Sequence, residues 1–130
     1  PIVEAYRRQF QPSDRCPEPR VLLCASALCA ETDDEAEALV AAVRAWRASG
    51  LRGPIPAASE GSTSRPVPIQ PGRRSVAHGS PDRVAARLDP MVEAFGAEEL
   101  MVVTICHDHE ARVRSYELLA TRFGVHPDAA

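Results

Sequence analysis

The segment from Gly79 to Phe123 constrains the fold most, because boundary signals divide it into a helix, a strand and a second helix. Ser80 and Pro81 are residues preferred at an N-cap and at the first helical position, and Gly96 is a typical helix end. Between these signals, apolar residues recur with the helical period, at Val84, Leu88, Val92 and Phe95. The pattern predicts a helix from residue 80 to residue 95.

A buried strand is predicted directly after this helix. Leu100 to Cys106 is an apolar run with a single polar interruption, which is typical of a strand covered on both faces in a parallel sheet. Asp108 is then a suitable cap for a helix from Glu110 to Phe123, and Gly124 ends that helix.

The first part of the chain repeats this order behind a short helix. We expect a helix over Ile2 to Phe10 and an apolar strand over Arg20 to Ala30. Thr32 and Glu35 have the spacing of a capping box for a further helix, Asp33 to Ser49. Strands that alternate with helices predict an α/β fold with βα units, parallel pairing and right-handed crossovers.

A long connection, Leu51 to Ala77, separates the two βα units. Its five prolines, with Gly and Ser, make it too broken for a helix, and it is too poor in apolar residues for a core strand. Loops of this length are usually either functional lids or mobile connections. We therefore expect one domain over residues 1–130, with a loop at residues 51–77.

Composition excludes several classes of function. The 15 basic and 18 acidic residues give a formal charge of −3, so no electrostatic footprint for a nucleic acid is visible. No apolar run approaches the roughly 18 residues of a membrane span and no signal peptide is recognisable, which predicts a cytoplasmic protein without a membrane partner. The four cysteines have no CxxC spacing and are expected to be reduced.

Several short groups of residues follow one another along the chain in a characteristic order. They are Tyr6 and Arg7, Phe10, Pro12 and Ser13, the run Thr32 to Ala36, the run Gly79 to Pro81 with Val84 and Leu88, the run Glu98 to Leu100, the run Val102 to Thr104, Arg112, Ser115 and Tyr116, and the run Leu118 to Ala120. In this combination they resemble the C-terminal end of bacterial luciferase-like, flavin-dependent monooxygenases. The resemblance covers nearly all of the chain except the loop at residues 51–77. Because members of the family have a mobile segment at this place, the resemblance implies that the loop is a lid that covers the flavin site.

This resemblance implies the C-terminal βα units of a TIM (β/α)8 barrel. The complete barrel takes roughly 250 residues, so the chain would hold only part of it. The implied activity is that of an FMN-dependent oxidoreductase, in which reduced flavin and O2 act on a small organic substrate. The family binds its flavin phosphate on strands outside this chain, so the isolated chain is expected to be inactive.

Candidate site residues follow from the rule that barrel chemistry lies at the carboxyl ends of the strands. In each strand, one face is purely apolar and the other also carries polar or thiol side chains. Ser26 lies on this mixed face of the first strand, Thr104 and Cys106 lie on that of the second, and His107 follows just beyond the end of the second strand. These faces are the candidates for the barrel interior, which leaves the aliphatic residues Met101, Val103 and Ile105 to pack under helices. Thr104, Cys106 and His107 would then border a pocket for flavin and substrate, and Ser26 and Thr104 are the candidates for cofactor contacts. The alternative is that these residues have structural roles only. Thr104 would then form a hydrogen bond to the backbone, Cys106 would fill space in the core and His107 would begin a helix.

Three other functions were weighed. The run from Cys106 to His109 is a weak metal candidate, because adjacent residues in a turn do not converge on one ion, and we expect no metal. A non-catalytic truncated barrel fragment would act as an interaction module, forming a homodimer or pairing with a complementing barrel half through its open sheet edge. A small stand-alone α/β enzyme would depend on His107.

Overall fold

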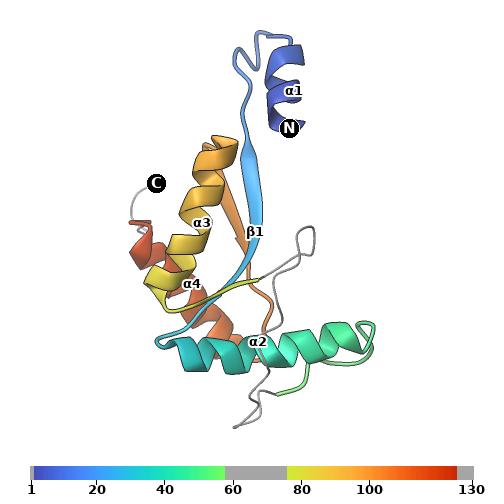
Figure 1. Ribbon diagram of the computed structural model, residues 1–130, viewed down its shortest axis with the longest axis vertical. Coiled ribbons are helices and arrows are strands. Elements are labelled where there is room, and N and C mark those ends of the chain that lie inside the picture. The colour runs from blue at the N-terminus through green and yellow to red at the C-terminus, as the bar shows by residue number, and fades with distance from the viewer. Residues whose placement is uncertain (1, 58–75, 126–130) are drawn as a thin grey trace.

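The computed structural model describes residues 2–57 and 76–125. Its helices and strands follow one another along the chain as Figure 1 shows. They are α1 (Ile2–Gln9), β1 (Leu22–Cys29), α2 (Asp33–Ala48), β2 (Ala77–Gly79), α3 (Pro81–Phe95), β3 (Glu99–Val103) and α4 (His109–Arg122).

The three strands form one parallel sheet in the order β2-β1-β3. β3 pairs with the amino-terminal part of β1, from Leu22 opposite Glu99 to Ser26 opposite Val103. β2 pairs with the last residues of β1, where Cys29 lies opposite Gly79. The predicted α/β class and the parallel pairing are therefore confirmed, whereas a closed TIM barrel is not seen among the described residues.

One face of the sheet is covered by α3 and α4, which run alongside β1 in Figure 1. Small side chains of β1, such as Ala25 and Ala27, allow these helices to pack closely against the sheet. The buried residues between the sheet and these helices form a hydrophobic core cluster. It consists of Ala25, Ala27, Cys29, Ala77, Val84, Leu88 and Leu119, with Leu100, Val102 and Leu118 packed against it. We call this side the covered face.

The other helix of the βα units, α2, crosses the carboxyl end of β1 (Figure 1). It begins at Thr32, whose side chain accepts a hydrogen bond from the backbone N–H of Glu35, as the capping pattern predicts. A second core cluster lies beneath it, made of Leu28, Ala30, Ala36, Leu39, Val40 and Cys106. α2 therefore closes the carboxyl end of the sheet on the side opposite to α3.

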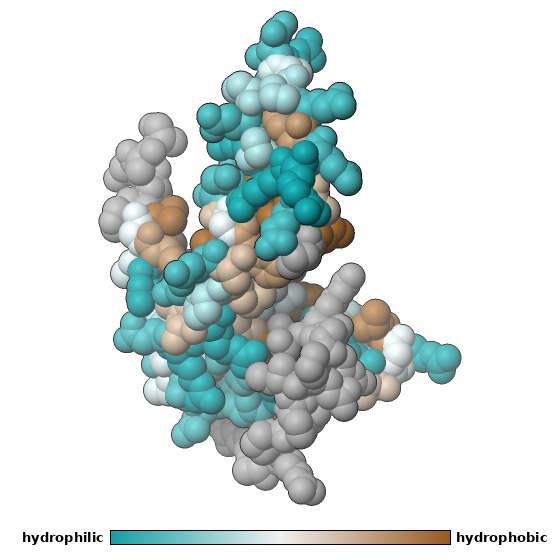
Figure 2. Space-filling view, turned by 45° about the horizontal axis from the view of Figure 1, so that its top comes forward, coloured by the Kyte–Doolittle hydropathy of each residue, from teal (hydrophilic) through white to brown (hydrophobic). Residues whose placement is uncertain are grey.

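The amino-terminal helix α1 extends beyond the other end of β1 (Figure 1) and buries none of its residues. Arg7 donates a hydrogen bond to the carbonyl of Gly96, the C-cap of α3, at 2.7 Å, and Tyr6 contacts Phe10 edge to face. Figure 2 shows that this end of the molecule is mainly polar.

Two expectations about the elements need correction. Ala77 belongs to the short strand β2, not to the long loop, and residues 58–75 of that loop, including the lid interpretation, lie outside the described residues. The strands are also shorter than expected, since β1 begins at Leu22 and β3 ends at Val103. Within the described ranges, no helix has the length and apolar character to cross a membrane.

Candidate functional site

The sheet face opposite to α3 and α4 carries apolar side chains that remain accessible to solvent. Leu22 and Met101 are each 49% exposed and Val103 is 39% exposed, and Cys24 beside them is also exposed. Parallel sheets are normally covered on both faces. We call this side the open face, and it is the largest departure of the described residues from an ordinary α/β core.

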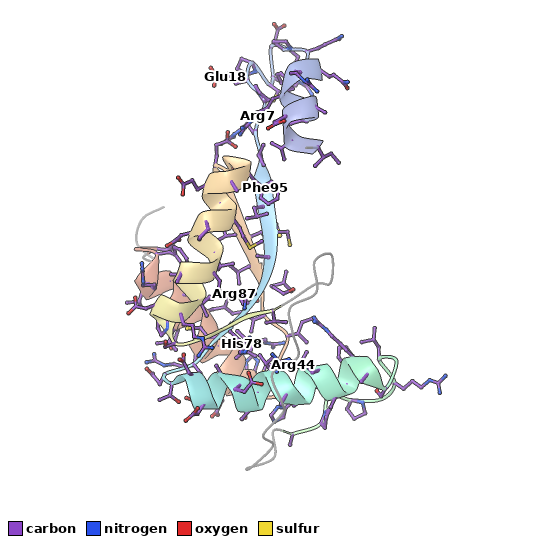
Figure 3. All side chains as sticks on the ribbon, in the orientation of Figure 1. Arg7, Glu18, Arg44, His78, Arg87 and Phe95 are labelled. Carbon is purple, nitrogen blue, oxygen red and sulfur yellow. The ribbon has the colours of Figure 1, made fainter. Side chains whose placement is uncertain are left out.

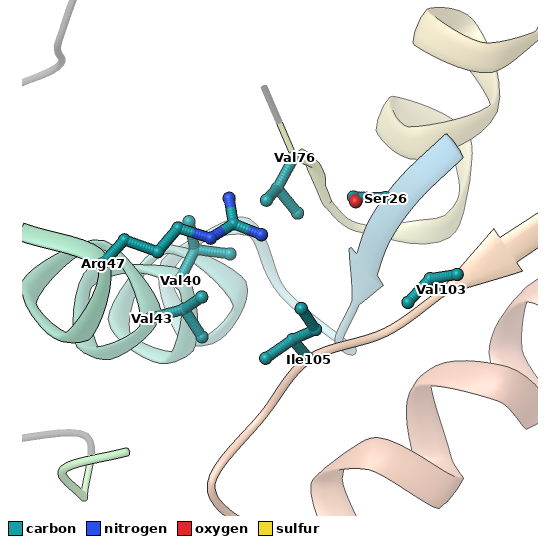
Figure 4. A pocket seen from close by; sticks show the side chains of 7 residues that line it. All are labelled: Ser26, Val40, Val43, Arg47, Val76, Val103 and Ile105. Carbon is teal, nitrogen blue, oxygen red and sulfur yellow. The ribbon is translucent and has the colours of Figure 1, made fainter. Parts of the chain in front are cut away.

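A shallow recess lies on the open face, at the carboxyl end of β1 and β3 (Figure 4). It is open to solvent, and essentially none of the roughly 200 Å³ between its walls is enclosed. Its walls come from α2, from both strand ends and from the residue before β2, and are Ser26, Val40, Val43, Arg47, Val76, Val103 and Ile105. The recess therefore combines apolar walls with one hydroxyl and one guanidinium.

The two polar side chains of the recess have no partner among the residues that the structure describes. Arg47 is half-buried, and no hydrogen bond or ion pair of its guanidinium is found within residues 2–57 and 76–125. Figure 4 shows the guanidinium extending from α2 toward Val76. The hydroxyl of Ser26 likewise has no hydrogen bond in the described part of the chain. Within these ranges, both groups have capacity to bind a polar group of a ligand.

Thr104 does not lie with Ser26. It is 6% exposed, and its hydroxyl donates a hydrogen bond to the carbonyl of Ala27 at 2.9 Å. Its backbone N–H donates to the hydroxyl of Tyr116 on α4 at 3.1 Å. These bonds fasten the end of β3 to β1 and to the covered face, which is the structural alternative for this residue.

Cys106 and His107 are not among the described residues that line the recess. Cys106 is 9% exposed and fills space beneath α2 with Leu28 and Leu39. His107 is exposed, immediately before Asp108, whose carboxylate accepts a hydrogen bond from Ala111 and so caps α4. That hydrogen bond is the main reason why the pKa of Asp108 is lowered. Among the described residues, His, Cys, Asp and Glu side chains nowhere gather in threes around a possible metal position.

The two faces of β3 are the reverse of the prediction. Leu100 and Val102 pack against the covered face, whereas Met101 and Val103 are exposed and Ile105 lines the recess. The prediction failed because both faces of this strand are almost wholly apolar, so the alternation separates two sides without saying which one the helices cover. For β1, Ala25 and Ala27 do face the helices and Ser26 faces away, as predicted.

A charged clasp joins the turns that follow β1 and β2. Asp33 accepts a hydrogen bond from the backbone N–H of Ser80 at 2.8 Å and pairs with Arg83 at 2.8 Å. These contacts lower the pKa of Asp33 from 3.8 to about 2, the hydrogen bond from Ser80 contributing most. Gly79 makes the close approach possible, since it has φ +138° and an added Cβ would lie 2.7 Å from Cδ of Arg83.

A second polar group, missed in the sequence, links β2 to α2. His78 Nε2 lies 2.7 Å from Glu37 Oε2, and Glu37 also pairs with Arg44 at 2.5 Å. Figure 3 shows His78 beside α2, the helix to which Arg44 belongs. The spacing of Glu37 and Arg44 places them on one side of the helix, but their contact with His78 could not be predicted without β2.

Cys29 lies on the covered face, and its thiol is unreactive near neutral pH. Its backbone N–H donates to the hydroxyl of Ser115 on α4 at 2.8 Å, and both residues are buried. Burial is the main cause that raises the pKa of the Cys29 thiol to about 11. The thiol stays protonated near neutral pH, so Cys29 is not a candidate nucleophile.

Comparison with known proteins finds relatives that are longer than this chain. No family model matches the chain. The uncharacterized proteins YwcH and YceB of Bacillus subtilis are 34% and 32% identical to it, over 93% and 91% of this chain but 39% and 38% of their own length. The crystal structure of apo-MsnO8 matches 96% of the chain and 41% of that protein, with 37% identity and a TM-score of 0.83. The chain thus spans about two fifths of the length of these proteins.

These findings overturn the predicted family and the activity that it implied. No family model supports the luciferase-like assignment, and the descriptions of the relatives name no luciferase, flavin or monooxygenase. The interpretation of the chain as the C-terminal part of an FMN-dependent monooxygenase is therefore contradicted. The alternative, a truncated remnant of such a barrel that acts as an interaction module, depended on the same assignment and is withdrawn with it.

Proposed function

We propose that this protein binds a small organic molecule in the recess on the open face, at the carboxyl ends of β1 and β3. The observation that carries the proposal is the coincidence, in one place, of apolar walls and two polar groups, Ser26 and Arg47, that have no partner in the described part of the chain. Ligand sites in proteins have this composition, a mainly apolar lining with a few polar groups that fix orientation. They also occur at the carboxyl ends of the strands in α/β proteins.

The finer fold assignment belongs to the same proposal. We interpret the sheet as part of a (β/α)8 barrel whose interior wall includes the open face. Both outer strands, β2 and β3, have an unpaired edge among the described residues, and Leu22, Met101 and Val103 would be covered by further strands. The greater length of the relatives is compatible with such strands. The cytoplasmic location stays a prediction beside it.

The lining of the recess decides which ligands to test. The recess is shallow and open, unlike the enclosed pockets of 300–1,000 Å³ typical of larger ligands, so the described residues do not enclose FMN. FMN, O2 and the candidate roles of Thr104, Cys106 and His107 remain predictions without a test. A short aliphatic compound fits the recess better, because five of its seven lining residues are Val or Ile.

The test compares two substitutions on the same strand and the same face. Ser26→Phe fills the recess, whereas Cys24→Phe adds the same ring two residues away, at an exposed position outside it. Titration calorimetry with hexanol should show saturable binding to the wild-type protein and to Cys24→Phe, with roughly millimolar affinity for so small a ligand. Binding to Ser26→Phe should be lost.

Three results would contradict the proposal. One is the absence of hexanol binding, and another is equal binding to Ser26→Phe and Cys24→Phe. The third is a dimer in sedimentation that hexanol does not affect and that Met101→Asp dissociates, because the open face would then be occupied by a second copy of the chain. FMN serves as a further probe, and its binding with loss in Ser26→Phe would assign the recess to the flavin instead.

A further inference from the structure

We infer that the ligand of the recess is a short aliphatic carboxylate, whose head group binds to Arg47 and whose hydrocarbon tail lies between Val43, Val103 and Ile105. This inference rests on the proposed function and adds the chemical class of the ligand. It is carried by the position of Arg47, by its lack of a partner among the described residues and by the character of the surrounding walls.

The position of Arg47 follows from the geometry of α2. Val40, Val43 and Arg47 are spaced by three and four residues, so they share the side of the helix that faces the recess. The aliphatic stem of Arg47 extends the apolar wall that the two valines begin, and its guanidinium lies at the end of that wall, near Val76 (Figure 4). An elongated ligand along this wall would meet apolar groups first and the cation at one end.

The lack of a partner distinguishes Arg47 from its neighbours. Arg44, one helical turn earlier, is paired with Glu37, and Arg83 on α3 is paired with Asp33. Arg114 and Arg122 on α4 have acidic partners as well. Arg47 is half-buried against apolar residues yet has no carboxylate partner in residues 2–57 and 76–125, so an anion from a ligand would supply the missing contact.

The donors available favour a carboxylate over a phosphate. A guanidinium presents a planar fork that matches the two oxygens of one carboxylate. Among the described lining residues, Ser26 is the other polar one, and its hydroxyl can complete the contacts of a carboxylate or of a second oxygen on the ligand. The dianionic phosphate group would need more donors than this recess offers.

The experiment compares hexanoate with hexanol, which has the same number of carbons and no charge. In calorimetry at low salt, we expect hexanoate to bind the wild-type protein at least about tenfold more tightly than hexanol. Arg47→Gln should abolish this preference, and Arg47→Lys should retain part of it. The matched control is Arg87→Gln on α3, which makes the same change of charge on the other side of the sheet (Figure 3).

The outcomes separate the inference from the proposed function. If hexanol binds but hexanoate binds no more tightly, or if Arg47→Gln keeps the preference, the carboxylate inference is wrong and the small-molecule site stands. An equal loss in Arg87→Gln would assign the effect to net charge and would also overturn the inference. If neither ligand binds to the wild-type protein, the proposed function itself fails.

Discussion

The two faces of the sheet are built from similar apolar residues but differ in their exposure to solvent. On the covered face, Ala25 and Ala27 are almost completely buried beneath α3 and α4, and Leu88 is 1% exposed. On the open face, Met101 and Leu22 are each 49% exposed, although they are no less hydrophobic. Hydrophobicity alone therefore does not decide which face forms the core. The difference is made by α3 and α4, which pack along one face of the sheet.

The comparison predicts its largest effect for a core substitution on the covered face. Leu88→Ala removes a fully buried side chain and leaves a cavity, so we expect a loss of about 3 kcal/mol in the free energy of unfolding. Met101→Ala on the open face should cost less than about 1 kcal/mol. Urea unfolding of both variants measures these values, and equal losses would show that the open face is packed as tightly as the covered one.

A smaller effect is expected for a hydrogen bond on the covered face. Ser115→Ala leaves the buried N–H of Cys29 without its acceptor, which should cost about 2 kcal/mol. Ser26→Ala on the open face removes a hydroxyl that has no partner in the described residues and should be close to neutral. The same unfolding measurement tests the pair, and a neutral Ser115→Ala would contradict the bond between α4 and β1.

The smallest effect concerns the clasp that joins the two faces at the carboxyl end of the sheet. The pKa of Asp33 is about 2 in the folded protein and 3.8 without its contacts, so this carboxylate stabilises the fold above pH 3.8. That contribution is lost as the pH falls through 2. Asp33→Asn should therefore flatten the decrease in melting temperature between pH 4 and pH 2, and Asp34→Asn should not. An unchanged slope in Asp33→Asn would argue against the clasp.

Much of the fold was predictable because its boundaries are marked locally. Thr32, Asp108 and Gly96 are residues whose side chain or backbone freedom suits a helix end, and each lies at the helix end that the structure shows. Strand β2 was missed because it has only three residues, Ala77 to Gly79, and its pairing with β1 is a long-range contact. A local pattern carries no information about such a contact.

The candidate site was less predictable than the fold. Ser26 was placed on the correct face of β1, but Arg47 was not identified, because the recess is assembled from α2, both strand ends and the residue before β2. Thr104 was assigned to the same interior as Ser26, and its hydrogen bonds to Ala27 and Tyr116 show why a polar residue in an apolar strand can serve the fold instead.

The most direct test of the central claim is a methyl NMR titration of the protein with hexanoate, in which both faces are observed in one spectrum. We predict saturable shifts for the methyl groups of Val43, Val103 and Ile105, which line the recess, and none for Val84 and Leu88 on the covered face. Shifts confined to Val84 and Leu88, or no saturable shift at any of these methyl groups, would contradict a ligand site on the open face.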